Sequence, residues 1–573
     1  MPSQEPFALW ILPGDFPGRL IPPFHLPAAG RYDLWALRPQ APVAVRITDS
    51  ETLFAAGPQG GPWIKLGTVD AAKPGAANSG RFYIRWEGDP PEALCISDPS
   101  AGGPHTESPP PGARRLSPAS GWVSLPRDDA MLHAQVRFFH LADECVASCN
   151  PAIGDVDGDG LDEFAVPYSL PGRKDCVACF KGDGRVLWVN EDLAFFQRFY
   201  NDPNRYQHFH LHDRICHRHL WSEARDVDGD GNVEVVVGIG PLYVLDGRTG
   251  DVKHVVDLKG CTHLWCFAAF DGPDRPAALV AAVDPLDRAA SGFVCAVSPA
   301  DGFDQRWRVE VPSRRFEDCM KAGDLDGDGR EEVAFSLSEV RQFWLMDGRG
   351  EVRWKVNVAD CIGDDSHVDD FRYVEHPDAG RCIVSGTGGT MLDAQGRVVW
   401  TLRRHLHHGQ TVRLLPAQER GRPALYFADS FDGKALFASM QGEVLSTVDD
   451  FTRVAAPRRN QFIHRLTTAC DLAHWGPGGS MVVVQGEIIA HRPGADIPAG
   501  DVPLRLSVIA PTGRYLGRLP FSDLAVCQGM MGAMCVRACK ATAHAAKTGR
   551  EDILVVLHTS DRAALYSLSA EPA

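Results

Sequence analysis

This chain of 573 residues lacks a long apolar run, a helical hydrophobic repeat and an excess of positive charge. No stretch approaches the ~18 apolar residues that a membrane span requires, so we expect no membrane partner. No long segment repeats its apolar residues with the helical period, which argues against a helical fold. The net charge is −16, from 58 Lys and Arg against 74 Asp and Glu, and this balance disfavours nucleic acid as a partner.

The first residues, Met1 to Pro6, lack the basic and apolar regions of a signal peptide, which favours a cytoplasmic location. Cysteine is plentiful, with 16 residues. Spacings such as Cys145…Cys149 and Cys176…Cys179 are compatible with zinc pairs. Most of these cysteines, however, lie in or beside expected strands, so we interpret them as small buried apolar residues.

The most informative feature is an acidic box, Asp-x-Asp-Gly-Asp-Gly, which occurs at residues 155–160, 226–231 and 324–329. In each copy the ninth position carries a glutamate, and an apolar strand follows directly. Carboxylates at alternate positions of a tight loop can point at one cation, and Ca²⁺ prefers ~6–8 oxygen ligands. An EF-hand needs Glu at position 12, where this chain has Val166, Val237 and Phe335, so the box is of another kind.

We therefore predict up to three structural Ca²⁺ ions. A turn without metal is the alternative, because Asp and Gly are common turn formers, but three copies with the same ninth-position acid favour metal. A closed oxygen shell leaves little room for substrate, so these ions are expected to serve folding. The predicted ligands are Asp155, Asp157, Asp159, Glu163, Asp226, Asp228, Asp230, Glu234, Asp324, Asp326, Asp328 and Glu332.

A second signal follows each box: an apolar strand, a Gly-containing turn and another strand, as at residues 179–188, 243–250 and 344–354. Glycine-rich turns between apolar strands predict hairpins. The same hairpin occurs without a box at residues 391–400. Units of four strands recur about eight times from residue 145 onward, at the period of propeller blades. We predict an all-β fold, a seven- or eight-bladed β-propeller over residues 129–573.

Residues 1–128 lack this pattern and contain alternating strands at 32–37, 43–47, 63–69 and 81–86. They predict a small N-terminal β-sandwich. The Trp63–Val69 run weakly resembles carbohydrate-binding modules. The Pro-rich stretch from Pro99 to Pro126 is interpreted as a linker.

On these boxes and hairpins, the chain resembles the FG-GAP (VCBS-type) repeat family over about residues 145–570. The resemblance implies a calcium-stabilised propeller. Its members include polysaccharide lyases that act on rhamnose- and uronate-containing polymers, often exported, and also non-enzymatic binding propellers. Fold alone does not decide between these activities.

Histidines precede the first strand of several units, and blades converge radially, so we expect these side chains to meet at one mouth. Aromatic and basic residues in the long link between the first and second units should join them. Such a site suits an acidic polysaccharide, because rings stack on aromatics and Arg binds carboxylates. The expected substrate-binding residues are His217, His367, His408, His464, Arg173 and Lys434.

The leading hypothesis is a lyase that cleaves a uronate-containing glycan by β-elimination. Such a step needs a neutralised carboxylate, a base near neutral pKa and an acid. His219 and His263 are the candidate base and acid, Tyr206 the alternative acid, and Arg288 and Arg341 the candidate neutralisers.

Three alternatives remain open. A glycoside hydrolase would need two carboxylates, which Asp284, Asp369 or Asp429 could supply. A propeller could bind a glycan without cleaving it. The histidines could instead hold a transition metal. We expect a monomer in each case.

Overall fold

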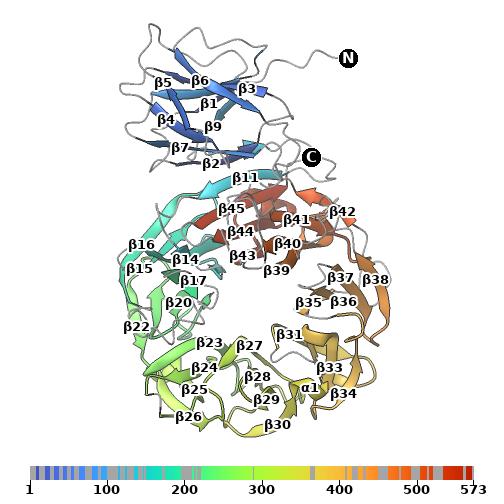
Figure 1. The fold of residues 1–573 in the computed structure, drawn as a ribbon. Helices are drawn as coiled ribbons and strands as arrows, with labels where there is room; N and C mark the ends of the chain where they lie inside the picture. Colours follow the sequence, from blue (N-terminus) through green and yellow to red (C-terminus); the bar gives the residue numbers. More distant parts are fainter. Residues whose placement is uncertain are drawn as a thin grey trace.

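The structure is a computed structural model and is all-β: antiparallel sheets follow one another around a ring, and two further sheets lie outside it (Figure 1). The α-helices of the described residues are α1 (Val358–Cys361) and α2 (Ala543–Thr548), and neither is long enough to cross a membrane. The structure describes residues 8–11, 20–25, 31–37, 43–47, 53–56, 63–70, 81–87, 92–97, 99, 114–116, 123–124, 134–139, 146–147, 150–170, 174–194, 210–211, 214–215, 221–287, 289–361, 368–406, 409–415, 424–429, 434–448, 463–476, 479–491, 504–512, 515–519, 533–558 and 563–570.

The N-terminal segment contributes two sheets, with strand orders β6-β3-β8-β1-β9 and β2-β7-β4-β5. Trp10 packs edge-on against Trp63 with ring centroids 5.0 Å apart. The four strands expected from the sequence are β3, β4, β6 and β7. Part of the stretch expected to be a linker is paired instead, since β9 runs parallel to β1. The strands are β1 (Ala8–Ile11), β2 (Leu20–His25), β3 (Arg31–Leu37), β4 (Val43–Ile47), β5 (Leu53–Ala56), β6 (Trp63–Asp70), β7 (Arg81–Glu87), β8 (Ala93–Ser97) and β9 (Arg114–Leu116).

Eight sheets, numbered here in chain order, form the ring (Figure 1). Sheet 1 contains β12 (Val146–Ala147), β13 (Ala152–Gly154), β14 (Glu163–Leu170), β15 (Lys174–Phe180) and β16 (Val186–Leu193); sheet 2, β19 (Trp221–Arg225), β20 (Glu234–Gly238), β21 (Leu242–Asp246) and β22 (Val252–Val256); sheet 3, β23 (Gly260–Ala268), β24 (Ala278–Pro285), β25 (Phe293–Ser298) and β26 (Asp304–Glu310); sheet 4, β27 (Phe316–Gly323), β28 (Glu332–Leu337), β29 (Gln342–Met346) and β30 (Val352–Asn357).

Sheet 5 contains β31 (Phe371–His376), β32 (Gly380–Ser385), β33 (Thr390–Asp393) and β34 (Val398–Thr401); sheet 6, β35 (Gly409–Leu415), β36 (Ala424–Asp429), β37 (Lys434–Ser439) and β38 (Val444–Val448); sheet 7, β39 (Ile463–His474), β40 (Met481–His491), β41 (Leu504–Ile509) and β42 (Tyr515–Leu519); sheet 8, β43 (Ala533–Cys539), β44 (Asp552–His558) and β45 (Ala563–Ala570) with β10 (Val123–Ser124) and β11 (Ala134–Phe139). A short hairpin, β17 (His210–Leu211) with β18 (Arg214–Ile215), lies between sheets 1 and 2 in the chain.

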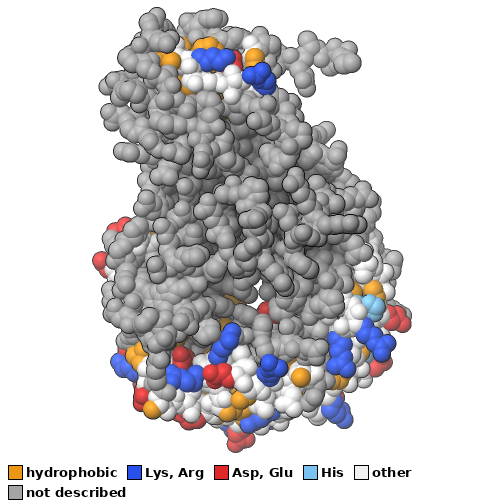
Figure 2. All heavy atoms as spheres, viewed as in Figure 1, with side chains coloured by type: hydrophobic (Ala, Val, Ile, Leu, Met, Phe, Trp, Pro, Cys, Tyr) orange, Lys and Arg blue, Asp and Glu red, His pale blue; other side chains and the backbone are white. Residues whose placement is uncertain are grey.

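In each of sheets 2 to 7 the first strand lies toward the middle of the ring and the fourth toward its outside (Figure 1). Burial is greatest in the second strand of a sheet and falls toward the outer strand. Every residue of β20 and β28 is buried, whereas β30 alternates between half-buried and exposed residues. A strand covered on both faces needs a continuous run of apolar residues, whereas an outer strand with one solvent-exposed face needs apolar and polar residues in alternation. Side chains of both signs are interspersed along the lower rim in Figure 2.

Tryptophans on outer strands join neighbouring sheets. Each donates its indole N–H to a backbone carbonyl at the hairpin turn of the next sheet. Trp188 donates to Gly247 at 2.7 Å, and Trp400 donates to Met440 at 2.8 Å. Trp307 and Trp354 repeat the contact with Gly348 and Ala394. Between sheets 2 and 3, His254 lies against Phe303 instead.

Sheet 8 combines strands that lie far apart in the chain, because β11 pairs with β45 along six residues. Acids at the turn between first and second strands also join neighbouring sheets. Glu331 and Ala269 exchange two hydrogen bonds between sheets 4 and 3, through the Glu331 side chain and both backbones. Glu551 and His474 do the same between sheets 8 and 7. The ring is therefore tied by strand pairing within sheet 8 and by turn contacts between neighbouring sheets.

Candidate functional site

The three acidic boxes form the turns between β13 and β14 in sheet 1, between β19 and β20 in sheet 2, and between β27 and β28 in sheet 4. The first aspartate organises the loop. Asp155 accepts hydrogen bonds from the amides of Gly158 and Gly160 at 2.8 and 2.9 Å. Asp226 and Asp324 make the same pair of contacts in their boxes. The two glycines of each box have positive φ, from 80° to 87°, so a side chain there would be strained.

The ninth-position glutamate begins the second strand and points back into the box. Glu163, Glu234 and Glu332 are buried, and each accepts a bond from the amide of the second box residue at 2.8–3.0 Å. Burial raises the pKa of Glu163 to about 7 and that of Glu332 to about 6, with nearby aspartates adding to the effect. A buried carboxylate without a cation is costly, so a bound cation would stabilise this arrangement.

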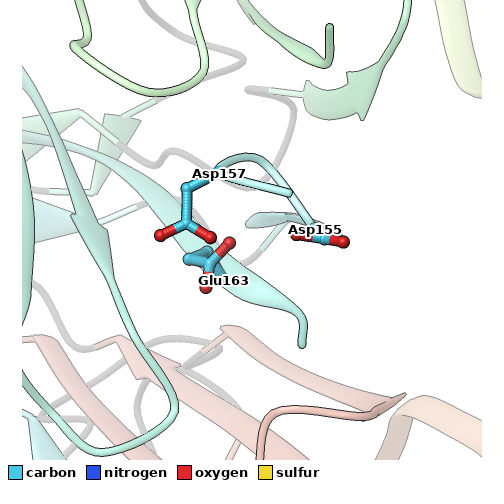
Figure 3. A group of neighbouring side chains, drawn as sticks. All are labelled: Asp155, Asp157 and Glu163. Carbon is cyan, nitrogen blue, oxygen red and sulfur yellow. The ribbon is translucent and has the colours of Figure 1, made fainter. Parts of the chain in front are cut away.

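The structure gathers three acids in each box, with one oxygen of each within 4.8 Å of the others: Asp155, Asp157 and Glu163 (Figure 3), Asp226, Asp228 and Asp230, and Asp324, Asp326 and Glu332. Nine of the twelve predicted ligands are thus brought together. Asp159 and Asp328 lie outside these groups and accept bonds from the amides of Leu161 and Arg330. Glu234 also lies outside its group and pairs with Lys253 at 2.8 Å. The donor set, all carboxylate oxygen, suits a hard divalent cation.

Most of the residues predicted at the mouth fall outside the described part of the chain: Tyr206, His217, His219, Arg288, His367, His408 and Arg173. For His263 in β23, His464 in β39 and Lys434 in β37, the strand backbone is described and the side chain is not. Arg341 is exposed at the turn between β28 and β29, with φ of 50°. Their shared mouth stays a prediction.

Near Arg341, one unpredicted arginine joins acids of two sheets. Arg314 donates from Nε to Asp284 at 2.8 Å and from its backbone to Glu339 at 2.7 Å. Asp284, a candidate for the hydrolase alternative, is therefore ion-paired. Asp369, another candidate, is buried and accepts the Thr387 hydroxyl at 3.1 Å. The side chain of Asp429 lies outside the described residues.

A chain of charged residues follows the inner strands of sheets 4 to 7. We call Lys321, Asp370, Arg372, Arg413 and Asp471 the inner-strand cluster. Lys321 of β27 contacts Asp370, which precedes β31. Asp370 accepts a bond from Arg413 of β35 at 2.7 Å and from the Val412 amide at 3.1 Å. Arg413 lies 4.0 Å from Asp471 of β39, and Asp471 accepts the amide of Ala538 in β43.

Positive charge is in excess in this cluster, with three cations for two carboxylates. Burial lowers the pKa of Lys321 to about 8, and the positive charges of Arg372 and Arg413 also lower it, whereas the Asp370 carboxylate acts in the opposite direction. Burial alone would raise the pKa of Asp370, but Arg372, Lys321 and Arg413 outweigh it and hold that pKa well below its usual range. Water still reaches the cluster, since 25% of the Lys321 side chain and 32% of Arg372 are exposed.

This cluster was not predicted from the sequence. Its members carry no motif and lie up to 150 residues apart (471 − 321 = 150), so only the ring brings them together. A charged residue between apolar residues of a first strand was the available signal, as at Arg413, which lies between Val412 and Leu414. The interpretation of the cysteines as buried residues fits the nine whose side chains the structure describes, of which eight are buried.

No family model matches the chain, and no curated protein matches it. Among solved structures it is similar to rhamnogalacturonan lyase YesW, with 14% identity, 98% of this chain and 88% of that chain covered, and a TM-score of 0.44. It is also similar to the Bacillus licheniformis rhamnogalacturonan lyase PL11, with 13% identity, 98% of this chain and 89% of that chain covered, and a TM-score of 0.42. A third similar structure is BamB from Moraxella catarrhalis, with 13% identity, 79% of this chain and 97% of that chain covered, and a TM-score of 0.38. At these identities and scores, the likeness does not determine the activity of this chain.

Proposed function

We propose that this chain is a calcium-stabilised, eight-bladed β-propeller that binds a uronate-containing glycan and cleaves it by β-elimination. The observation that carries the proposal is the inner-strand cluster. Lys321, Arg372 and Arg413 surround one carboxylate on adjacent inner strands, and two of the three cations keep solvent contact. Arginine binds carboxylates in a fork geometry, so an excess of such cations favours an acidic sugar over a neutral one.

In the proposed reaction a cation pairs with the uronate carboxylate, which makes the C5 proton removable. A base takes that proton, the bond from C4 to the glycosidic oxygen breaks, a C4–C5 double bond forms, and an acid protonates the leaving oxygen. His219 and His263 are proposed as base and acid, with Tyr206 as alternative acid. Arg288 and Arg341 are proposed to assist the cluster in neutralising charge.

The remaining mouth residues, His217, His367, His408, His464, Arg173 and Lys434, are proposed to hold the polymer. The two N-terminal sheets are proposed as a β-sandwich domain within residues 1–128. The eight successive sheets support eight blades, with β10 and β11 completing the last one.

Calcium is proposed at the three boxes, held by the acids that each box gathers. It would supply countercharge to the buried glutamates and rigidity to the turns, and no step of the reaction passes through it. Asp157 and Glu163, for example, come from the turn and from the following strand, so an ion between them would fix one against the other.

The proposal is tested by incubating the protein with uronate-rich polysaccharides and following ultraviolet absorbance of the unsaturated uronate product. Arg372→Met should lower kcat/KM by on the order of 10²-fold, the typical cost of losing one charge-stabilising group. The matched control is Arg308→Met on outer strand β26, where Arg308 stacks on Phe293 at 3.6 Å, and this variant should stay fully active. New reducing ends without absorbance would indicate hydrolysis, and binding without either would indicate a non-catalytic glycan-binding protein.

A further inference from the structure

A lysine ammonium reaches into the first acidic box. Lys181 lies directly after β15, at the start of the turn to β16, and its Nζ is 2.5 Å from Asp157, 2.6 Å from Asp159 and 3.7 Å from Glu163. Only 13% of its side chain is exposed. The contacts include both a loop acid and the buried ninth-position acid, so this ammonium lies where a metal ion would bind.

A second lysine does the same in the second box from a different position of its sheet. Lys253 belongs to outer strand β22. Its Nζ lies 2.9 Å from Asp228, 2.8 Å from Glu234 and 3.5 Å from Asp230. Two different segments therefore supply an internal cation to two equivalent boxes.

The third box differs. Its basic neighbours are arginines, and each contacts one loop acid from the rim: Arg353 donates to Asp326 at 2.8 Å, and Arg381 contacts Asp324. Both side chains are nearly half exposed, at 46% and 45%. Among the described residues no ion pair reaches the buried Glu332. A planar guanidinium is too broad to occupy the centre of the loop, so that centre stays available to a metal ion.

We propose that Lys181 and Lys253 are resident cations of the first and second boxes, and that the third box is the high-affinity divalent-metal site of this chain. The inference rests on the proposed metal binding and refines it. A divalent ion can enter the third box without breaking an ion pair at its ninth-position acid. In the other boxes it must first displace an ammonium that holds two or three carboxylates, which lowers its apparent affinity.

The test is calorimetric titration of Ca²⁺ into the full chain after metal has been removed with chelator. Wild type should show one tight site and two weaker ones. Lys181→Met and Lys253→Met should each convert one weak site to a tight one, with a Kd for Ca²⁺ lowered on the order of tenfold or more. The double variant should show three tight sites.

Arg185→Met is the matched control for loss of a nearby positive charge. Arg185 acts on Asp159 through the long-range electrostatic effect of its charge, and it forms no ion pair within the box among the described residues. Its removal should change affinity far less than Lys181→Met does. A second readout is thermal melting: without calcium, Lys181→Met should melt below wild type, since Asp157, Asp159 and Glu163 lose the ammonium that contacts all three, and calcium should restore it.

The lysine inference would be overturned if wild type had three equally tight calcium sites. It would also be overturned if Lys181→Met and Arg185→Met bound calcium with equal affinity. Either result would leave the proposed metal binding intact. No calcium binding in wild type and none in the double variant would overturn both the inference and the proposed metal role.

Discussion

Asp162 and Lys540, 378 residues apart in the chain, exchange two hydrogen bonds across the seam between sheets 1 and 8. The Asp162 amide donates to the Lys540 carbonyl at 3.0 Å, and the Lys540 amide donates to the Asp162 carboxylate at 2.6 Å. Asp162 is the eighth residue of the first box. The box therefore connects its own sheet to the preceding one, as Glu331 does at the third box.

Replacing this carboxylate should weaken the seam. Asp162→Ala leaves the Lys540 amide without its side-chain acceptor, and the expected loss in free energy of unfolding is about 1 kcal/mol. Asp183→Ala is the control, because Asp183 accepts a hydrogen bond from the amide of Arg185, two residues away in its own turn. Urea denaturation of both variants checks this; an equal loss in the two would contradict a special role for the seam contact.

The tryptophan contact between sheets 5 and 6 depends on a glycine. Gly442 has φ of 80°, and a Cβ there would lie 2.8 Å from the Trp400 ring. Gly442→Ala should therefore combine backbone strain with collision and cost about 2–4 kcal/mol. Gly380→Ala is the control, since Gly380 has φ of 72° and open space around it, and should cost about 1 kcal/mol. Equal losses in thermal unfolding would show that the packing against Trp400 is unimportant.

Calcium removal should lower the melting temperature. A ligand at ~100 times its Kd stabilises the folded state by about 2.7 kcal/mol per site. Asp324→Ala removes an acid that also organises the third box, so its melting temperature should respond less to calcium than that of wild type. Differential scanning calorimetry with calcium and with chelator measures the effect. Unchanged melting of wild type in excess chelator would contradict the metal interpretation.

Lys321 should titrate near pH 8. Its pKa is lowered from 10.5 to about 8, so between these values the unfolded chain binds the proton that the folded chain has lost. The contribution of this group to stability therefore rises with pH through that window. Lys321→Met should remove this part of the pH dependence of the unfolding free energy, whereas Lys355→Met, on outer strand β30, should retain it. A Lys321 signal in lysine-labelled NMR that titrates near 10.5 would refute the assignment.

Local signals predicted much of the scaffold. The boxes, the Gly-containing hairpins and the alternating N-terminal strands each depend on a few neighbouring residues, and each marks a strand boundary in the structure. The inner-strand cluster could not be predicted this way. Asp370 meets Lys321, Arg413 and the Val412 amide only because three sheets place their first strands side by side. Lys181 in its box was missed for a similar reason, since the intervening strands β14 and β15 fold it back onto Asp157.

The central claim is that the cationic inner strands act on an acidic glycan, and one comparison tests it most directly. Wild type, Arg372→Met and Arg308→Met are given the same uronate-rich polymer, and the ultraviolet absorbance of the unsaturated product is followed. Absorbance should grow with wild type and with Arg308→Met, and its rate of growth should be reduced on the order of 10²-fold with Arg372→Met. Absence of absorbance with wild type on every such polymer, or full activity of Arg372→Met, would contradict it.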